Sequence, residues 1–201
     1  DAELVGGDLT RSDSLVINVT AMGSLGGSGA PLTLDKARAG QTLVAHGKIG
    51  YSAAGLALLE RFGRALPQEL EDLWPLVDAH CAPTLTPGRG VIARATGSTA
   101  MTDNSDGLVR DMGLMAQRSS VNIDLDPAAI APDALLVSAG AVLDVDPWEW
   151  VLSGGEDHTL LATTYKAAPS GFREIGQVQR GTGVTVGGEA PRFTGGWESF
   201  A

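Results

Sequence analysis

Hydrophobic side chains recur along this chain with two periods, one typical of strands and one typical of helices. Over residues 52–66, apolar positions recur every three or four residues, which predicts a helix with one buried face. Residues 15–22 (LVINVTAM) are rich in β-branched side chains, alternate in part and are bounded by turn residues, so we predict a strand there. The two patterns together indicate a chain that mixes helices with strands.

The same patterns predict the remaining elements. Strands are expected at 42–45, 100–102, 121–125, 159–163, 175–178 and 184–186. Helices are expected to begin at Pro67 and to span about 87–95, 107–118, 132–143 and 147–152. Because these helices and strands follow one another in no strict alternation, their order predicts an α+β (two-layer α/β) fold rather than a doubly wound sheet.

Glycine gathers in one stretch, Gly23–Gly29 (GSLGGSG), which indicates a flexible connector. We therefore place a domain boundary there and expect two parts, residues 1–27 and residues 28–201. Glycine as a whole makes up 27 of the 201 residues, roughly twice the usual share of ~7%, which suggests many tight turns. The chain begins without Met and enters an apolar run almost at once, so we expect it to be a fragment of a longer protein.

Charge and composition exclude several classes of protein. There are 14 Lys and Arg against 24 Asp and Glu, a net charge of −10, so no face can be basic enough for duplex DNA. No 18-residue apolar run and no secretory leader pattern occur in the sequence, so we expect neither a membrane span nor secretion. The single cysteine, Cys81, cannot form an internal disulfide, and we expect a cytoplasmic protein.

The best candidate site in the sequence is the acidic loop Asp103-Asn104-Ser105-Asp106-Gly107. Its two carboxylates lie between a predicted strand and a predicted helix, so they converge near the helix N-terminus. Oxygen ligands at that point suit a hard divalent cation, and the free N–H groups of the helix suit phosphate oxygens. The alternative is ordinary helix capping with an Asx turn, which the bare motif favours equally.

Two further acidic glycine turns strengthen the metal interpretation. They are Gly6-Gly7-Asp8 and Gly154-Gly155-Glu156-Asp157, and either one alone is more often a simple turn. Metal-dependent phosphoryl transfer, however, needs several carboxylates around magnesium, which three such segments can supply. Near the C-terminus, Trp197 follows a Gly-Gly pair, and we expect its ring to stack on a flat or cationic ligand or simply to dock the tail.

Taken in order, six segments resemble the thiamine-monophosphate kinase family of the aminoimidazole-ribotide-synthetase-like superfamily. They are VGGDLTR, KARAGQTLVAHGKIGYSAAGLALL, APTLTPGRG, TDNSDGL, LSGGEDHTLL and GGWESF. The resemblance implies that residues 28–201 are the C-terminal domain of that superfamily. It implies that residues 1–27 are the remnant of an N-terminal ATP- and magnesium-binding domain and include its last strand.

The resemblance also implies an activity and a set of roles. The family transfers the γ-phosphate of ATP to thiamine monophosphate, giving thiamine diphosphate, with Mg²⁺ bridging the phosphates and usually as a homodimer. By resemblance, Gly7, Asp8 and Ser105 contact ATP; Asp8, Asp103 and Asp106 bind Mg²⁺; and Glu156 and Trp197 contact thiamine monophosphate. No covalent nucleophile is expected, because the substrate phosphate itself attacks.

Three positions depart from the family pattern. Leu34 stands where the family has an Arg, for which Lys36 or Arg38 could substitute, Tyr51 stands for an Asp, and His158 stands for a Tyr. Two alternatives therefore stay open: a non-catalytic paralogue that binds a nucleotide or thiamine phosphate, and a related enzyme with another acceptor. Because the family's first acidic loop lies upstream, we expect these 201 residues alone to be inactive.

Overall fold

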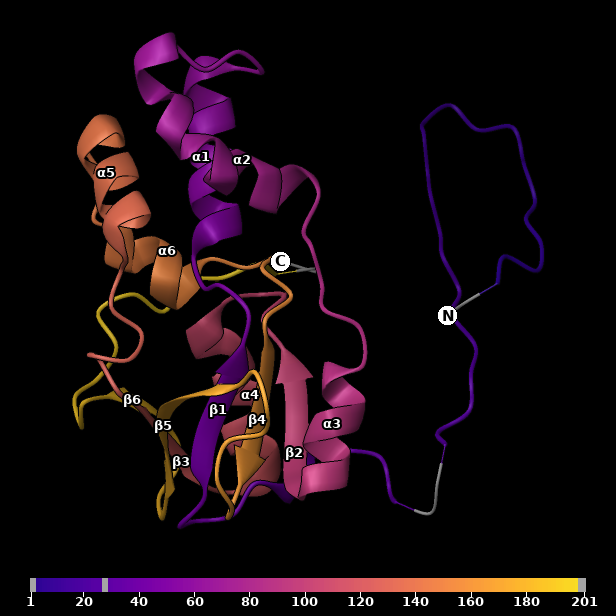
Figure 1. Ribbon diagram of the computed structural model, residues 1–201, viewed down its shortest axis with the longest axis vertical. Coiled ribbons are helices and arrows are strands. Elements are labelled where there is room, and N and C mark those ends of the chain that lie inside the picture. The colour runs from indigo at the N-terminus through magenta and orange to yellow at the C-terminus, as the bar shows by residue number, and fades with distance from the viewer. Residues whose placement is uncertain (1–2, 27–28, 199–201) are drawn as a thin grey trace.

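A six-stranded sheet organises most of the chain in the computed structural model, which describes residues 3–26 and 29–198 (Figure 1). In chain order the strands are β1 (Thr42–His46), β2 (Ser98–Asp103), β3 (Asn122–Leu125), β4 (Leu160–Thr164), β5 (Arg173–Gln179) and β6 (Gly183–Val186). They lie side by side in the order β2-β4-β1-β5-β3-β6, and every neighbouring pair is antiparallel except β3 with β6. This mixed arrangement confirms the predicted α+β class.

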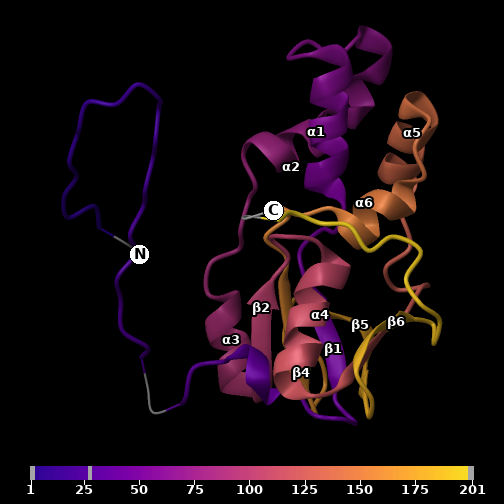
Figure 2. The ribbon, with the colours of Figure 1, turned by 180° about the vertical axis from the view of Figure 1, so that it is seen from behind.

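Within the described part of the chain, six α-helices and two short 3₁₀ helices complete the fold. They are η1 (Leu34–Lys36), α1 (Tyr51–Phe62), η2 (Gln68–Leu73), α2 (Trp74–Cys81), α3 (Arg89–Thr96), α4 (Leu108–Ser119), α5 (Ala134–Leu143) and α6 (Pro147–Ser153). Helix α4 runs along one face of the sheet (Figure 2), whereas α1, α2, α5 and α6 gather beyond one end of the strands (Figure 1). One face of the sheet is thus covered by α4, and a second group of helices lies beyond one end of the strands.

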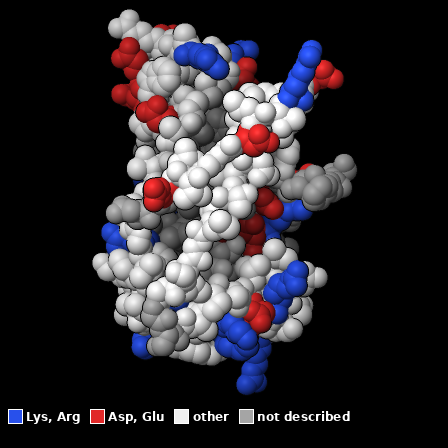
Figure 3. Space-filling model, turned by 90° about the vertical axis from the view of Figure 1, so that its right-hand side faces the viewer, with Lys and Arg blue, Asp and Glu red and all other residues white. Residues whose placement is uncertain are grey.

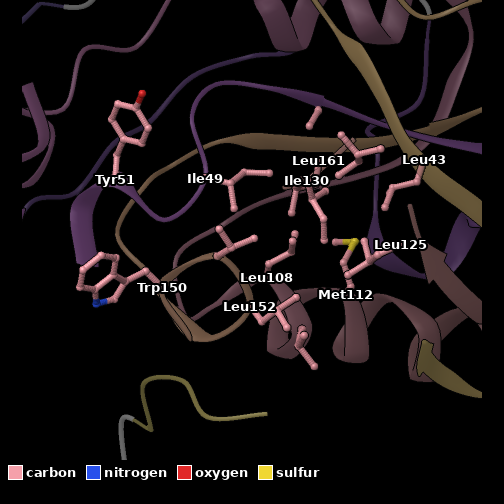
Figure 4. Packing of buried hydrophobic residues seen from close by; sticks show 14 of the residues in the cluster. Leu43, Ile49, Tyr51, Leu108, Met112, Leu125, Ile130, Trp150, Leu152 and Leu161 are labelled. Atoms are coloured by element: carbon pink, nitrogen blue, oxygen red, sulfur yellow. The ribbon is translucent and has the colours of Figure 1, made fainter. Parts of the chain in front are cut away.

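One part of the core lies between α4 and the sheet, and the rest extends among α1, α2, α5 and α6. Leu108 and Met112 of α4 are fully buried and point toward Leu43, Leu125 and Leu161 of the strands (Figure 4). This burial follows from the sequence pattern, because positions four apart in α4 share one face of the helix. The start of α4 is therefore fixed against the sheet, and so is the acidic loop that precedes it.

The first helix is shorter than its apolar pattern predicts. We predict a helix over 52–66, but α1 ends at Phe62, where Gly63 follows with a positive φ (71°) and its N–H donates to the carbonyl of Leu59. After Pro67 the chain forms the 3₁₀ helix η2 before α2 begins, rather than one continuous helix. The other helices and the six sheet strands lie within a few residues of their predicted positions.

The strand predicted at Leu15–Met22 is wrong for this chain. Residues 3–26 are exposed and extended, and they stand apart from the sheet (Figures 1 and 2). A strand forms through hydrogen bonds to a neighbour, and none of the six described strands pairs with this segment. The proposed boundary between residues 27 and 28 lies outside the described residues, so the two-part division stays a prediction.

Among residues 3–26 and 29–198, no helix combines the length and the apolar character that crossing a membrane requires.

Candidate functional site

The acidic loop 103–107 is shaped by a buried carboxylate one turn into α4. The backbone N–H groups of Ser105, Asp106 and Gly107 donate to Oδ2 of Asp111 at 3.0, 3.1 and 3.2 Å. Burial, with Asp111 only 7% exposed, raises the pKa of this carboxyl to about 6. The loop therefore wraps around Asp111.

This arrangement corrects one expectation about the loop. Ser105 does not cap α4, because Gly107 is the N-cap and no side chain caps the helix there. The N–H groups of Ser105, Asp106 and Gly107 donate to Asp111, whereas the expected contact of phosphate with the free N–H groups of the helix stays a prediction. The carboxylates of Asp103 and Asp106 project outward and are about two-fifths exposed. They remain available to a ligand.

The turn 154–158 is fastened to this loop by backbone hydrogen bonds. The N–H of Glu156 donates to the carbonyl of Ser105 at 2.9 Å, and that of His158 donates to the carbonyl of Asn104 at 3.0 Å. The contact is so close that a Cβ on Gly155 would lie 2.2 Å from the carbonyl oxygen of Ser105. Two of the three acidic turns singled out in the sequence thus form one site.

Asp157 points inward and ties this site to the first helix. Its carboxylate accepts the N–H of Gly50 at 2.6 Å, the N–H of Ser52 at 2.8 Å and the side-chain amide of Asn104 at 3.1 Å. Burial is the main reason that the pKa of Asp157 rises to about 6. Asp157 therefore positions the site, while its neighbour Glu156 faces solvent.

His158 lies between the two acidic turns. Its Nδ1 is 3.3 Å from Oδ2 of Asp103, and its Nε2 is 3.9 Å from Oε2 of Glu156. Both Glu156 (φ 61°) and His158 (φ 51°) adopt the left-handed conformation that ordinary residues rarely occupy. The imidazole thus faces the two carboxylates to which the resemblance assigns metal and substrate contacts.

Trp197 is held beside the same loop through its backbone. Its N–H donates to the carbonyl of Asp106 at 2.9 Å, while its side chain is 69% exposed. Arg110 of α4 adds a contact of 3.0 Å to Glu198. The tail is therefore docked through its backbone while the ring is exposed, and stacking of the ring on a ligand stays a prediction.

Asp8 and Gly7 do not join this group. They lie in the extended segment, where a Cβ on Gly7 would meet nothing within 4 Å and the carboxylate of Asp8 accepts only from the nearby Thr10 hydroxyl. Within the part of the chain that the structure describes, no group of three or more His, Cys, Asp or Glu side chains is arranged to hold a metal. The magnesium role of Asp8 therefore stays a prediction.

A groove of about 1110 Å³ opens beside the site, with Asp157 and His158 in its wall. Across it, the hydroxyl of Tyr51 donates to Asp133 at 2.5 Å, and Nζ of Lys48 lies 4.9 Å from the centre of the Tyr51 ring. Burial and the Asp133 carboxylate raise the pKa of Tyr51, so the phenol is a hydrogen-bond donor. Tyr51, one of the three departures from the family pattern, thus faces this groove.

Sequence reasoning identified the exposed carboxylates but not the residues that hold their loop in place. Asn104 is fully buried, Asp111 holds the loop, and neither was assigned a role. Asp111 lies in the first turn of a predicted helix, where acidic residues are common, so its position carried a weak signal. On the face seen in Figure 3, acidic and basic side chains are interspersed. Local geometry rather than overall charge therefore distinguishes the site.

Comparison with known proteins identifies two informative relatives by sequence. The thiamine-monophosphate kinase of Corynebacterium glutamicum is 64% identical over 203 residues, which cover 99% of this chain and 60% of that protein. The thiamine-monophosphate kinase of Mycobacterium tuberculosis H37Rv is 43% identical over 201 residues, which cover 99% of this chain and 58% of that protein. The chain thus spans about three-fifths of the curated relatives it matches. No protein-family model matches it.

The fold agrees with the sequence comparison. The structure of AaThiL complexed with AMPPCP and TMP superposes with a TM-score of 0.75 at 31% identity, covering 84% of this chain and 54% of that one. The similarity of fold therefore extends over most of this chain.

Proposed function

We propose that this chain, a homologue of the thiamine-monophosphate kinases, is part of an enzyme that transfers the γ-phosphate of ATP to thiamine monophosphate. The product is thiamine diphosphate. The relative whose structure contains AMPPCP and TMP supports both the nucleotide and the acceptor. The homodimer, the cytoplasmic location and the role of residues 1–27 as the remnant of an ATP-binding domain rest on the family resemblance.

One observation carries this proposal: three groups of different chemistry meet at the loop 103–107. The carboxylates of Asp103 and Asp106 project from it, the backbone of Glu156 is bonded to Ser105, and the backbone of Trp197 is bonded to Asp106. Transfer between two phosphorylated molecules needs alignment and charge neutralisation more than a covalent nucleophile. This convergence supports a single site that combines candidate groups for metal, polar and ring contacts.

The exposed carboxylates fit Mg²⁺. This ion prefers oxygen ligands and is commonly held by one or two carboxylates together with water and substrate phosphates. Asp103 and Asp106 provide two such groups on a loop fixed by Asp111, and Asp8 is the further ligand proposed from residues 1–27. When bound, Mg²⁺ neutralises the negative charge of the reacting phosphates.

The residues of the chain itself then orient the two substrates. Ser105 and Gly7 are proposed to contact ATP, Glu156 to bind a polar group of thiamine monophosphate, and the exposed Trp197 ring to stack on its aromatic part. The backbone hydrogen bonds that fasten Glu156 and Trp197 to the loop keep these contacts in a fixed relation to Asp103 and Asp106. The phosphate oxygen of thiamine monophosphate can then attack in line.

Assaying the full-length protein that contains this chain tests the proposal. Wild-type protein should form thiamine diphosphate from ATP and thiamine monophosphate only when Mg²⁺ is present. Asp103→Asn and Asp106→Asn should each lower kcat/KM by about a hundredfold or more, because each removes a charged ligand. Asp72→Asn is the matched control, since Asp72 is an exposed carboxylate in η2, away from the acidic loop.

Two outcomes would contradict the proposal. Activity that survives the double variant Asp103→Asn, Asp106→Asn would overturn the site assignment. Binding of ATP and thiamine monophosphate by wild-type protein without turnover would instead favour the non-catalytic paralogue.

A further inference from the structure

Strained backbone marks the turn that carries His158. Among the residues that the structure describes, four other than glycine have positive φ values: Ser120, Asp144, Glu156 and His158. Ser120 and Asp144 are C-caps of α4 and α5, where this conformation is ordinary. Glu156 and His158 cap no helix, and a left-handed non-glycine residue costs on the order of 1 kcal/mol or more. Such strain persists where the surrounding structure holds the residue in place.

Backbone hydrogen bonds to the acidic loop keep Glu156 and His158 in this strained conformation. The N–H of His158 donates to the carbonyl of Asn104, and the N–H of Glu156 donates to that of Ser105. In the reverse direction, the N–H of Asn104 donates to the carbonyl of Thr159 at 2.9 Å. The backbone of the turn is therefore fixed, and it directs the His158 ring into the gap between Asp103 and Glu156.

Each ring nitrogen faces a different carboxylate. Nδ1 lies 3.3 Å from Asp103 and Nε2 lies 3.9 Å from Glu156, while the His158 side chain is one-third exposed. Asp103 and Glu156 are the residues proposed to bind the metal and thiamine monophosphate. Without a partner, either exposed carboxylate would sample several rotamers, and ordering it on ligand binding would cost affinity.

We propose that His158 is a positioning residue that fixes the carboxylate of Asp103. This inference rests on the proposed function, and it adds a residue to which the family resemblance assigns no role. Nδ1 lies within hydrogen-bond distance of Asp103, whereas Nε2 lies too far from Glu156 for a hydrogen bond. His158 therefore preorganises one ligand contact through Nδ1, in the way that hydrogen-bonded partners orient metal ligands elsewhere.

Three variants of the full-length protein test this contact. His158→Ala removes both nitrogens. His158→Asn keeps a donor near the position of Nδ1 and so preserves the contact with Asp103. His158→Gln places its amide near the position of Nε2 and so does not restore that contact. His46→Ala is the matched control, because His46 bonds the carbonyl of Gly171 at 2.6 Å and contacts neither acidic turn.

Binding measurements without turnover provide the readout. Mn²⁺ binding is measured by electron paramagnetic resonance of the free ion, and thiamine monophosphate binding by calorimetry with AMPPCP present. His158→Ala should weaken Mn²⁺ by about tenfold, the effect typical of losing a partner of a metal ligand. It should leave thiamine monophosphate binding unchanged, because Nε2 lies 3.9 Å from Glu156, beyond hydrogen-bond distance. His158→Asn should restore the Mn²⁺ constant, and His158→Gln should not.

A purely structural role would give a different pattern. His158→Ala would then lower the thermal midpoint and the fraction of competent protein while leaving both dissociation constants unchanged, as expected of His46→Ala. An unchanged Mn²⁺ constant in His158→Ala, or Asn and Gln variants that behave alike, would overturn the proposal while wild-type activity still supports the kinase function. Wild-type protein that binds neither Mn²⁺ nor thiamine monophosphate would overturn both.

Discussion

Carboxylates in this site divide into two kinds according to burial. Asp111 and Asp157 are inward-facing and accept backbone N–H groups, whereas Asp103 and Asp106 project outward. The sequence motif revealed the outward pair, because their spacing beside glycine is visible without a structure. It could not reveal the inward pair, because their hydrogen bonds depend on a loop that folds back and on a helix distant in sequence.

Replacing Asp111 with Ala should destabilise the protein. The change leaves the N–H groups of Ser105, Asp106 and Gly107 without their acceptor, which should lower the free energy of unfolding by about 2 kcal/mol. Urea denaturation measures this loss. Asp106→Ala is the control, because the exposed Asp106 contacts Arg110 at 4.0 Å and its removal should change the free energy by less than about 0.5 kcal/mol. Equal losses in the two variants would contradict the assigned role of Asp111.

The raised pKa of Asp157 should make stability depend on pH in a definite direction. Its pKa is about 6 in the folded protein against an ordinary value of 3.8, so between these values the folded state binds more protons than the unfolded state. The free energy of unfolding should therefore fall as pH rises from about 4 to 6. Urea midpoints in metal-free buffer should show this fall, and Asp157→Asn should make it shallower. An unchanged slope in the variant would contradict the prediction.

Helices and strands were predicted where one side of each element meets the core. The period of apolar residues located α4 and the central strands, because their buried faces are continuous. The same reasoning failed at Leu15–Met22, where the pattern suits a strand but the described chain supplies no neighbour. It also extended α1 past Gly63, because periodicity takes no account of a glycine with a positive φ.

Close packing between elements predicts that Gly155 cannot be enlarged. A Cβ there would lie 2.2 Å from the carbonyl oxygen of Ser105, so Gly155→Ala should push the turn off the acidic loop. We expect a loss of about 1–3 kcal/mol in the free energy of unfolding. We also expect weaker thiamine monophosphate binding in the full-length protein.

Gly113 offers the matched control for this change. It lies inside α4, and an added Cβ would meet nothing within 4 Å. Gly113→Ala should therefore raise stability by about 0.5–1 kcal/mol, because alanine favours the helix. Thermal unfolding of both variants checks the contrast, and a stable Gly155→Ala would show that the turn tolerates displacement.

At the scale of the whole molecule, residues 3–26 differ in kind from the folded part. Their large apolar side chains, among them Leu15, Val16 and Ile17, are more than three-quarters exposed. An unpaired strand-like segment with this composition is suited to pairing with another sheet. This feature agrees with the proposal that the segment belongs to an N-terminal domain.

Limited proteolysis should separate the two parts. Thermolysin cuts at exposed large apolar residues, so in the 201-residue chain it should cleave within residues 15–22 well before it cleaves the sheet domain. Mass spectrometry identifies the fragment. In the full-length protein the same segment should resist cleavage if it pairs with upstream strands. Equal sensitivity in both proteins would count against the two-part division.

The fastening of turn 154–158 to loop 103–107 also bears on how the site comes into being. Asn104 and Asp157 are 53 residues apart in the chain, and their hydrogen bond closes only after β4 can pair with β2. Contacts of such separation are slow to form, because a long loop must close before they stabilise anything. During synthesis, the acidic loop therefore emerges from the ribosome long before its partner turn. Ligand affinity should consequently appear late in folding and report on completion of the sheet.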